Sequence, residues 1–172
     1  SDLSDPSTID LPYYVTAHEM AHQWWGHQVG TANVQGSQVI PESLAQYSAL
    51  RVMERKYGEA KLRKFLRFEL DRYLRDRGTE RVGEQPLLRA ENQGYIHYQK
   101  GSVVMMAIKD RIGASKLDAG LKAFVNEFQY KQTPYPTTLD LVRHIKAGLT
   151  ADEQTFVDHL FNDITLYDLR LL

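Results

Sequence analysis

The sequence predicts a mainly α-helical fold, and three observations support that prediction. Apolar residues recur with the 3.6-residue period of amphipathic helices through most of the chain. Glycines, prolines and N-cap residues separate these periodic stretches, as they do between helices. No stretch shows a convincing alternation of apolar and polar residues, so no β-strand is expected.

The first predicted helix follows a polar lead-in over residues 1–12. Helical periodicity begins after Pro12 and runs from about residue 13 to residue 28. Residues 30–41 contain two glycines and a proline among polar residues, which is typical of a connection.

Two helices and a long loop are predicted next. The second helix covers residues 42–57, and Gly58 is its expected C′ residue. The third covers residues 59–77 with a clear apolar stripe, and Gly78 is expected to end it. The following segment, 79–93, has no convincing period and is predicted to be a loop that could line an active-site cleft.

The second half of the chain is also predicted to be helical. A helix over residues 94–112 is apolar nearly all round and is therefore expected to be central, and another follows over residues 115–130. Two further helices are predicted from capping boxes: Thr137 with Asp140, and Thr150 with Glu153, the last helix continuing towards Tyr167.

The composition is that of a soluble globular chain of one domain or two small subdomains. The chain has 172 residues, of which 42% are hydrophobic and 25% charged, and its net charge is −1. This balance gives no reason to expect nucleic-acid binding. The longest apolar run, residues 103–108, is far shorter than the roughly 20 residues that cross a bilayer. The absence of cysteine excludes disulfides but does not identify the compartment.

The motif His18-Glu19-Met20-Ala21-His22 predicts a catalytic zinc site. On a helix, His18 and His22 differ by about 40° in azimuth and about 6 Å in rise, so both rings can bind one cation. Glu19 lies about 100° further round and can reach a zinc-bound water without being a ligand. Chance, a structural metal site and two core histidines are the alternatives, but the bulky apolar flanks favour a helix buried in a catalytic domain.

A third protein ligand is expected, and without cysteines it must be a histidine or a carboxylate. His27 lies nine positions after His18, or about 180° round the same helix, so it is predicted to point away. The only acidic residue between His22 and Glu54 is Glu42, at the start of the second predicted helix. Glu42 is therefore the predicted third ligand.

Residues 18–26 followed by residues 42–45 resemble the aminopeptidase N family of gluzincin zinc metallopeptidases. In that family one residue fewer separates the second histidine from the glutamate ligand, which is preceded by asparagine and followed by Gly-Phe-Ala. Here Pro41 replaces the asparagine and Ser43-Leu44 replaces Gly-Phe. The flexible connection can absorb the extra residue. The resemblance implies a helical subdomain of a thermolysin-like (gluzincin) catalytic domain followed by further helices, truncated at its N-terminal side.

Tyr98, Lys100 and Gly101 match the Tyr-x-Lys-Gly segment of the same family. The resemblance implies that Tyr98 is the catalytic tyrosine, which donates a hydrogen bond to the oxyanion of the tetrahedral intermediate. Tyr95, about 60° away on the same helix, is the alternative. The remaining histidines have no matching partners and are predicted to pack or to lie at the surface: His97, His144 and His159.

The resemblance implies zinc-dependent peptide-bond hydrolysis, with peptides as substrates. His18, His22 and Glu42 would hold Zn²⁺, and Glu19 would act as the general base towards a zinc-activated water. Removal of N-terminal residues is implied by kinship alone, because the family's Gly-Ala-Met-Glu-Asn-type segment, which holds the substrate's α-amino group, does not occur in the sequence. That segment and a β-rich region are expected upstream. The alternatives are a zinc endopeptidase and a non-catalytic or weakly active zinc-binding module.

Residues 42–50 and 164–168 extend the likeness to the peptidase region of bacterial proteins that join an aminopeptidase-N-like domain to transporter permease spans. This likeness implies a membrane-embedded full-length protein of which the chain is a soluble fragment without membrane contact of its own. Residues 1–172 are then expected to form a zinc metallopeptidase catalytic fragment. Residues 1–78 would form the zinc-binding helices, and residues 79–93 a loop. Residues 94–172 would form a helical part that carries Tyr98.

Overall fold

A computed structural model describes residues 8–164 of the chain. Within this range the predicted mainly α-helical fold is confirmed, because the residues form seven α-helices and no β-strand. Their bounds are α1 Leu11–Ala21, α2 Glu42–Tyr57, α3 Glu59–Thr79, α4 Gly101–Ile112, α5 Ala114–Phe128, α6 Thr138–Lys146 and α7 Ala151–Asn162. Between residues 8 and 164, no helix has the length and apolar character needed to span a membrane.

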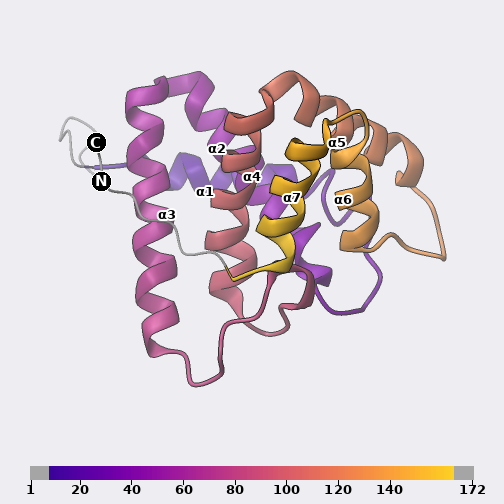
Figure 1. Cartoon of the computed structure of the whole chain (residues 1–172). Helices are drawn as coiled ribbons and strands as arrows, with labels where there is room; N and C mark the ends of the chain where they lie inside the picture. The colour runs from indigo at the N-terminus through magenta and orange to yellow at the C-terminus, as the bar shows by residue number, and fades with distance from the viewer. Residues whose placement is uncertain (1–7, 165–172) are drawn as a thin grey trace.

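Helix α2 lies at the centre of the fold, where it packs against α1, α3 and α4. Figure 1 shows α3 on one side of the molecule and α5 and α6 on the opposite side, with α2 and α4 between them. Leu44, Ala45, Ala49, Leu50 and Met53 of α2 are completely buried. The element that begins with Glu42 is therefore fixed by apolar contacts on several sides.

The first helix is shorter than the sequence predicts, because α1 ends at Ala21 and not near residue 28. Beyond His22, the backbone N–H groups of His27, Gln28 and Val29 donate to carbonyls five positions earlier, in turns wider than those of an α-helix. Gly26 has a φ of +107°, a conformation that favours glycine. The apolar pattern continues past Ala21 because Trp25 and Val29 are buried in this turn, not because the helix goes on.

The other predicted helices are found, with changes at their ends. Helix α2 has the predicted bounds, whereas α3 continues through Gly78 to Thr79, so the prediction that Gly78 ends it is wrong. Helix α5 covers Ala114–Phe128 and is shifted by one or two residues at each end. Both predicted capping boxes are present, and α7 ends at Asn162; Tyr167 lies outside the described residues.

A π-helical turn, Ile96–Lys100, directly precedes α4. The predicted helix over residues 94–112 is thus helical throughout, but its first part is wound more widely than an α-helix. Such turns hold one extra residue and occur frequently at functional sites. Tyr98 lies in the middle of this turn.

Candidate metal centre

His18, His22 and Glu42 converge at the contact between α1 and α2. Their potential ligand atoms all lie within 4.8 Å of one another, and they form the only such group of three among residues 8–164. The two Nε2 atoms are 3.1 Å apart, and Oε2 of Glu42 lies 3.3 Å from Nε2 of His18 and 3.6 Å from Nε2 of His22. The structure therefore brings together all three residues that the sequence predicts as ligands.

The spacing of these three atoms fits a zinc ion. Ligands at the usual zinc distances in a tetrahedral site are about 3.3–3.4 Å from one another, close to the three observed separations. His22 Nδ1 lies 3.0 Å from the carbonyl oxygen of Trp25, an acceptor, so Nδ1 carries the hydrogen and Nε2 presents a lone pair to the centre. Oε2 of Glu42 is buried and has no hydrogen-bond partner. A cation would satisfy both groups.

Glu42 is held as an anion. It occupies the first turn of α2, where the helix dipole favours a negative charge. Burial raises the pKa of Glu42, but its contacts with His18, Tyr98 and His22 lower it by more, so the net pKa lies below the usual range. The carboxylate is therefore charged at neutral pH, as a metal ligand must be.

A cleft with a volume of about 370 Å³ opens beside His18, and both Glu19 and Tyr98 line it. Glu19 is exposed and lies outside the group of three donor atoms. The Tyr98 ring lies 5.9 Å from the His18 ring, centroid to centroid, and its hydroxyl interacts with Glu42. Burial and the charges of Glu42 and Glu19 raise the pKa of Tyr98 to about 12, so its hydroxyl keeps its proton at neutral pH.

Tyr95, the alternative to Tyr98, also lines the cleft but is buried. Its hydroxyl accepts a hydrogen bond of 3.4 Å from Gln93, and its ring packs against Tyr73 at 5.9 Å between centroids. Tyr98, in contrast, lies with its ring beside the ligand His18, and it is near enough to Glu42 for the carboxylate to raise its pKa. The geometry thus gives Tyr98, not Tyr95, access to the candidate metal centre.

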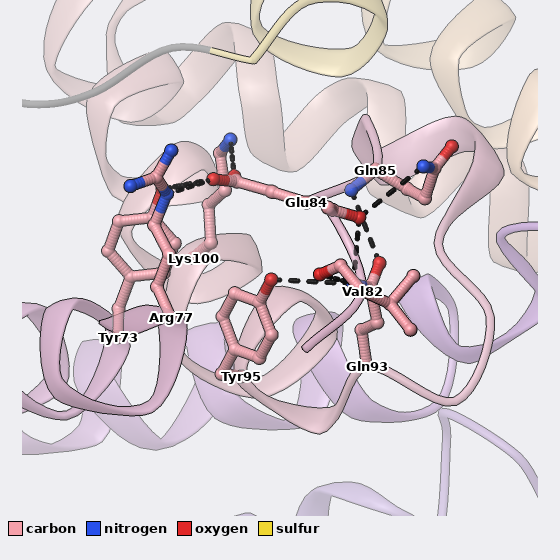
Figure 2. Close-up of polar contacts among 9 residues, drawn as sticks. Tyr73, Arg77, Val82, Glu84, Gln85, Gln93, Tyr95 and Lys100 are labelled. Carbon is pink, nitrogen blue, oxygen red and sulfur yellow. Dashed lines mark hydrogen bonds and ion pairs between the residues drawn. The ribbon is translucent and has the colours of Figure 1, made fainter. Parts of the chain in front are cut away.

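The loop over residues 79–93 does not line this cleft, contrary to the sequence prediction. Instead its Glu84 is buried and accepts hydrogen bonds from Tyr73, Arg77 and Lys100, as Figure 2 shows. Lys100 is the last residue of the π-helical turn. The loop therefore contacts the end of the π-helical turn through Glu84 without lining the cleft.

Glu69 of α3 is a buried carboxylate that sequence reasoning missed. Its Oε1 accepts a 2.9 Å hydrogen bond from Gln46, whereas its buried Oε2 has no partner. Burial raises the pKa of Glu69 by more than the nearby polar groups of Tyr14 and Gln46 lower it. One signal was available in the sequence, because Glu69 falls on the apolar stripe that contains Phe65 and Tyr73.

The remaining histidines lie outside the group of three donor atoms. His97 is buried with its ring against Tyr98, and His144 is buried and bonded to Glu127 and to the Asp140 carbonyl. His159 is exposed and pairs with Asp163. His27 follows α1 and is not on that helix, so its predicted place about 180° round the helix is wrong, although His27 does lie outside the group of three donor atoms.

The sequence of the chain matches a known protein family over most of its length. The sequence profile described as the Peptidase family M1 domain matches residues 7–162. The chain belongs to peptidase family M1. This M1 membership confirms the family resemblance that the motifs of residues 18–26 and 98–101 indicate.

Individual M1 relatives show how much of the family's length the chain spans. It is 28% identical over 123 residues to human endoplasmic reticulum aminopeptidase 2, a match that covers 68% of the chain and 13% of that protein. The M1 zinc metallopeptidase of Deinococcus radiodurans has a similar fold, with a TM-score of 0.69 and 24% identity. A glutamate-to-alanine variant of the Deinococcus radiodurans enzyme bound to a Tyr-Ser-Ala substrate gives a TM-score of 0.70 and 23% identity. Each of these two matches covers 91% of the chain described here. The same matches cover 34% of the Deinococcus radiodurans chain.

Proposed function

We propose that this M1 chain carries the catalytic centre of a zinc-dependent peptidase, in which His18, His22 and Glu42 hold Zn²⁺. The observation that carries the proposal is the triangle of ligand atoms, with separations of 3.1, 3.3 and 3.6 Å. Its Glu42 oxygen is buried without a hydrogen-bond partner. A structural zinc site has four protein ligands, whereas three protein ligands leave a position open, as in catalytic zinc sites.

Glu19 and Tyr98 supply the proton transfer and the oxyanion contact of the proposed reaction. When bound, zinc supplies the Lewis acidity that activates water and polarises the scissile carbonyl. Glu19, exposed in the cleft, takes the proton of the attacking water and later delivers it to the leaving amine. Tyr98 keeps its proton because its pKa is about 12, and it donates a hydrogen bond to the developing oxyanion.

We further propose that the full-length enzyme removes N-terminal residues from peptides. The curated human relative is named an aminopeptidase, and a related structure holds a Tyr-Ser-Ala substrate. Because the chain spans 34% of that structure, we place the group that binds the substrate's α-amino end in the remainder of the catalytic domain. The likeness to transporter-linked peptidases adds the proposal that the full-length protein is embedded in a membrane.

The test is the hydrolysis of aminoacyl amides by the full-length protein and by its Glu19→Gln variant. Loss of the general base should lower kcat by about 10²–10⁴-fold while the zinc content stays at the wild-type level. Glu91→Gln is the matched control, because Glu91 is exposed and outside the cleft. Wild-type turnover in Glu19→Gln would contradict the role of Glu19.

A second substrate separates the competing functions. Peptides with an acetylated N-terminus should resist the enzyme if it requires a free α-amino group. Their cleavage at internal bonds would identify an endopeptidase instead. Zinc binding without turnover of either substrate would identify a non-catalytic module.

A further inference from the structure

Lys100 places a positive charge in the protein interior. Its side chain is completely buried, and the side chain of its partner Glu84 is 2% exposed. A buried ammonium group is costly unless an anion and hydrogen bonds compensate it. Glu84 meets that need, because its Oε1 accepts a hydrogen bond from Nζ of Lys100.

Two residues of α3 hold the Glu84 carboxylate in place. The Tyr73 hydroxyl donates to it, with distances of 2.9 and 3.0 Å to its two oxygens, and Nε of Arg77 lies 2.5 Å from Oε2. Figure 2 shows these donors and Lys100 meeting at the one carboxylate. The ion pair thus joins the π-helical turn to α3 through a residue of the intervening loop.

Gln93 fixes the loop on both sides of Glu84. Its side-chain amide donates to the carbonyls of Gly83, at 3.1 Å, and Val82, at 3.4 Å, and its Oε1 accepts from the backbone N–H of Gln85 at 3.2 Å. Figure 2 shows the Gln93 side chain directed towards Val82 and Gln85. The loop is therefore held in a shape that directs the carboxylate inward.

The position of Lys100 in the chain links this network to Tyr98. Side chains two positions apart leave a helical turn on roughly opposite faces. Accordingly, Tyr98 lines the cleft, whereas Lys100 points into the interior towards Glu84.

The orientation of Tyr98 depends on the π-helical turn being kept. The Gly101 N–H donates to the carbonyl of Ile96, five positions earlier, so the turn holds one residue more than an α-helical turn. A return to the α-helical register would rotate Tyr98 by about 100° relative to α4. That rotation would carry its hydroxyl away from Glu42.

We infer that Glu84 and Lys100 are positioning residues whose buried ion pair holds the π-helical turn that directs the Tyr98 hydroxyl towards the metal centre. This inference rests on the proposed role of Tyr98 as the oxyanion donor. The ion pair acts at the end of the turn. Neither residue lines the cleft, so their effect on turnover is indirect, and the Tyr98 background of the test below shows whether it passes through Tyr98.

The test is a double-mutant cycle in the full-length enzyme, with kcat, KM and zinc content measured for each variant. Glu84→Gln should lower kcat about 10–100-fold, the scale expected for a small misplacement of a catalytic group, with little change in KM or zinc content. In the Tyr98→Phe background the same substitution should lower kcat by less than about twofold, because the hydroxyl it positions is already gone. Glu91→Gln, an exposed carboxamide substitution in the same loop, should leave kcat unchanged in both backgrounds.

A second variant guards against loss of folding. Glu84→Gln leaves the Lys100 charge buried and unpaired, which can unfold a protein. If it does, Glu84→Gln combined with Lys100→Met takes its place in the cycle. This pair of substitutions leaves no buried charge without a partner, because Arg77, which also loses the Glu84 carboxylate, is partly exposed to solvent. It should bind zinc and show the same Tyr98-dependent loss of kcat.

Three outcomes would overturn the inference, and they differ in what else they remove. An equal loss of kcat in the wild-type and Tyr98→Phe backgrounds, or no loss in either, would remove the positioning role alone. Wild-type kcat in Tyr98→Phe itself would remove the proposed oxyanion role and this inference with it.

Discussion

Ser43 Oγ lies 2.6 Å from the backbone carbonyl oxygen of His97 and donates a buried hydrogen bond to it. Ser43 directly follows Glu42, and His97 directly precedes Tyr98. One contact thus ties the predicted third metal ligand to the predicted oxyanion donor. Sequence comparison marks Ser43 only as a departure from the Gly-Phe-Ala pattern, whereas the structure gives it a bonding partner.

Gly101 allows α2 and the π-helical turn to approach this closely. A Cβ atom at Gly101 would lie 2.1 Å from Oγ and 2.7 Å from Cβ of Ser43, distances that real Cβ atoms do not show. Glycine is therefore required at this position for a steric reason that depends on Ser43.

We predict that Gly101→Ala lowers the free energy of unfolding by about 1–3 kcal/mol, the usual cost of overpacking a core. Chemical denaturation of wild type and variant measures this difference. Gly78→Ala is the matched control: a Cβ there meets nothing within 4 Å, and because Gly78 lies in the last turn of α3, alanine should stabilise by at most about 0.5–1 kcal/mol. Adding Ser43→Gly to Gly101→Ala should recover part of the loss. Equal stability of Gly101→Ala and Gly78→Ala would contradict the steric account.

The Glu84 ion pair should make stability depend on pH in the acid range. Burial alone would raise the pKa of Glu84, but hydrogen bonds from Lys100 and Arg77 lower it by more, so its folded pKa lies below the usual 4.5. A lowered folded pKa contributes stability that is complete above the unfolded pKa and is lost as the pH falls through the folded value. The free energy of unfolding should therefore decline more steeply below about pH 4.5 in wild type than in Glu84→Gln.

The control for this pH effect is Glu91→Gln, whose stability curve should run parallel to that of wild type. Glu91 is exposed and contributes no buried pair. If the curves of wild type and Glu84→Gln run parallel throughout the acid range, the ion pair does not contribute in the way described.

Much of the helical framework was readable from local sequence patterns. The bounds of α2 follow from the connection before Glu42 and from Gly58 after it, and the two capping boxes mark the starts of α6 and α7. The end of α1 was not readable, because Trp25 and Val29 continue the apolar pattern into a turn whose hydrogen bonds are not helical. The π-helical turn was also hidden, since one inserted residue barely disturbs the period of a helix that is apolar nearly all round.

The candidate site also contains residues that local sequence patterns could predict and residues that they could not. His18 and His22 could be paired from their spacing on one helix, which is a local relation. The ion pair between Glu84 and Lys100 could not be predicted from the sequence. Glu84 lies in a loop without periodicity, and no local pattern relates residues 16 positions apart. Glu42 is an intermediate case. It was predicted as a ligand because it is the only acidic residue between His22 and Glu54 and because it matches the family pattern, and in the structure it lies beside both histidines.

The zinc content of the purified full-length protein tests the central claim most directly, with Glu42→Ala and the matched Glu91→Ala measured beside wild type. We predict about one zinc ion per chain in wild type and in Glu91→Ala, and strongly reduced zinc in Glu42→Ala, which loses one of three protein ligands. A wild-type protein that is metal-free and takes up no added zinc would contradict the account.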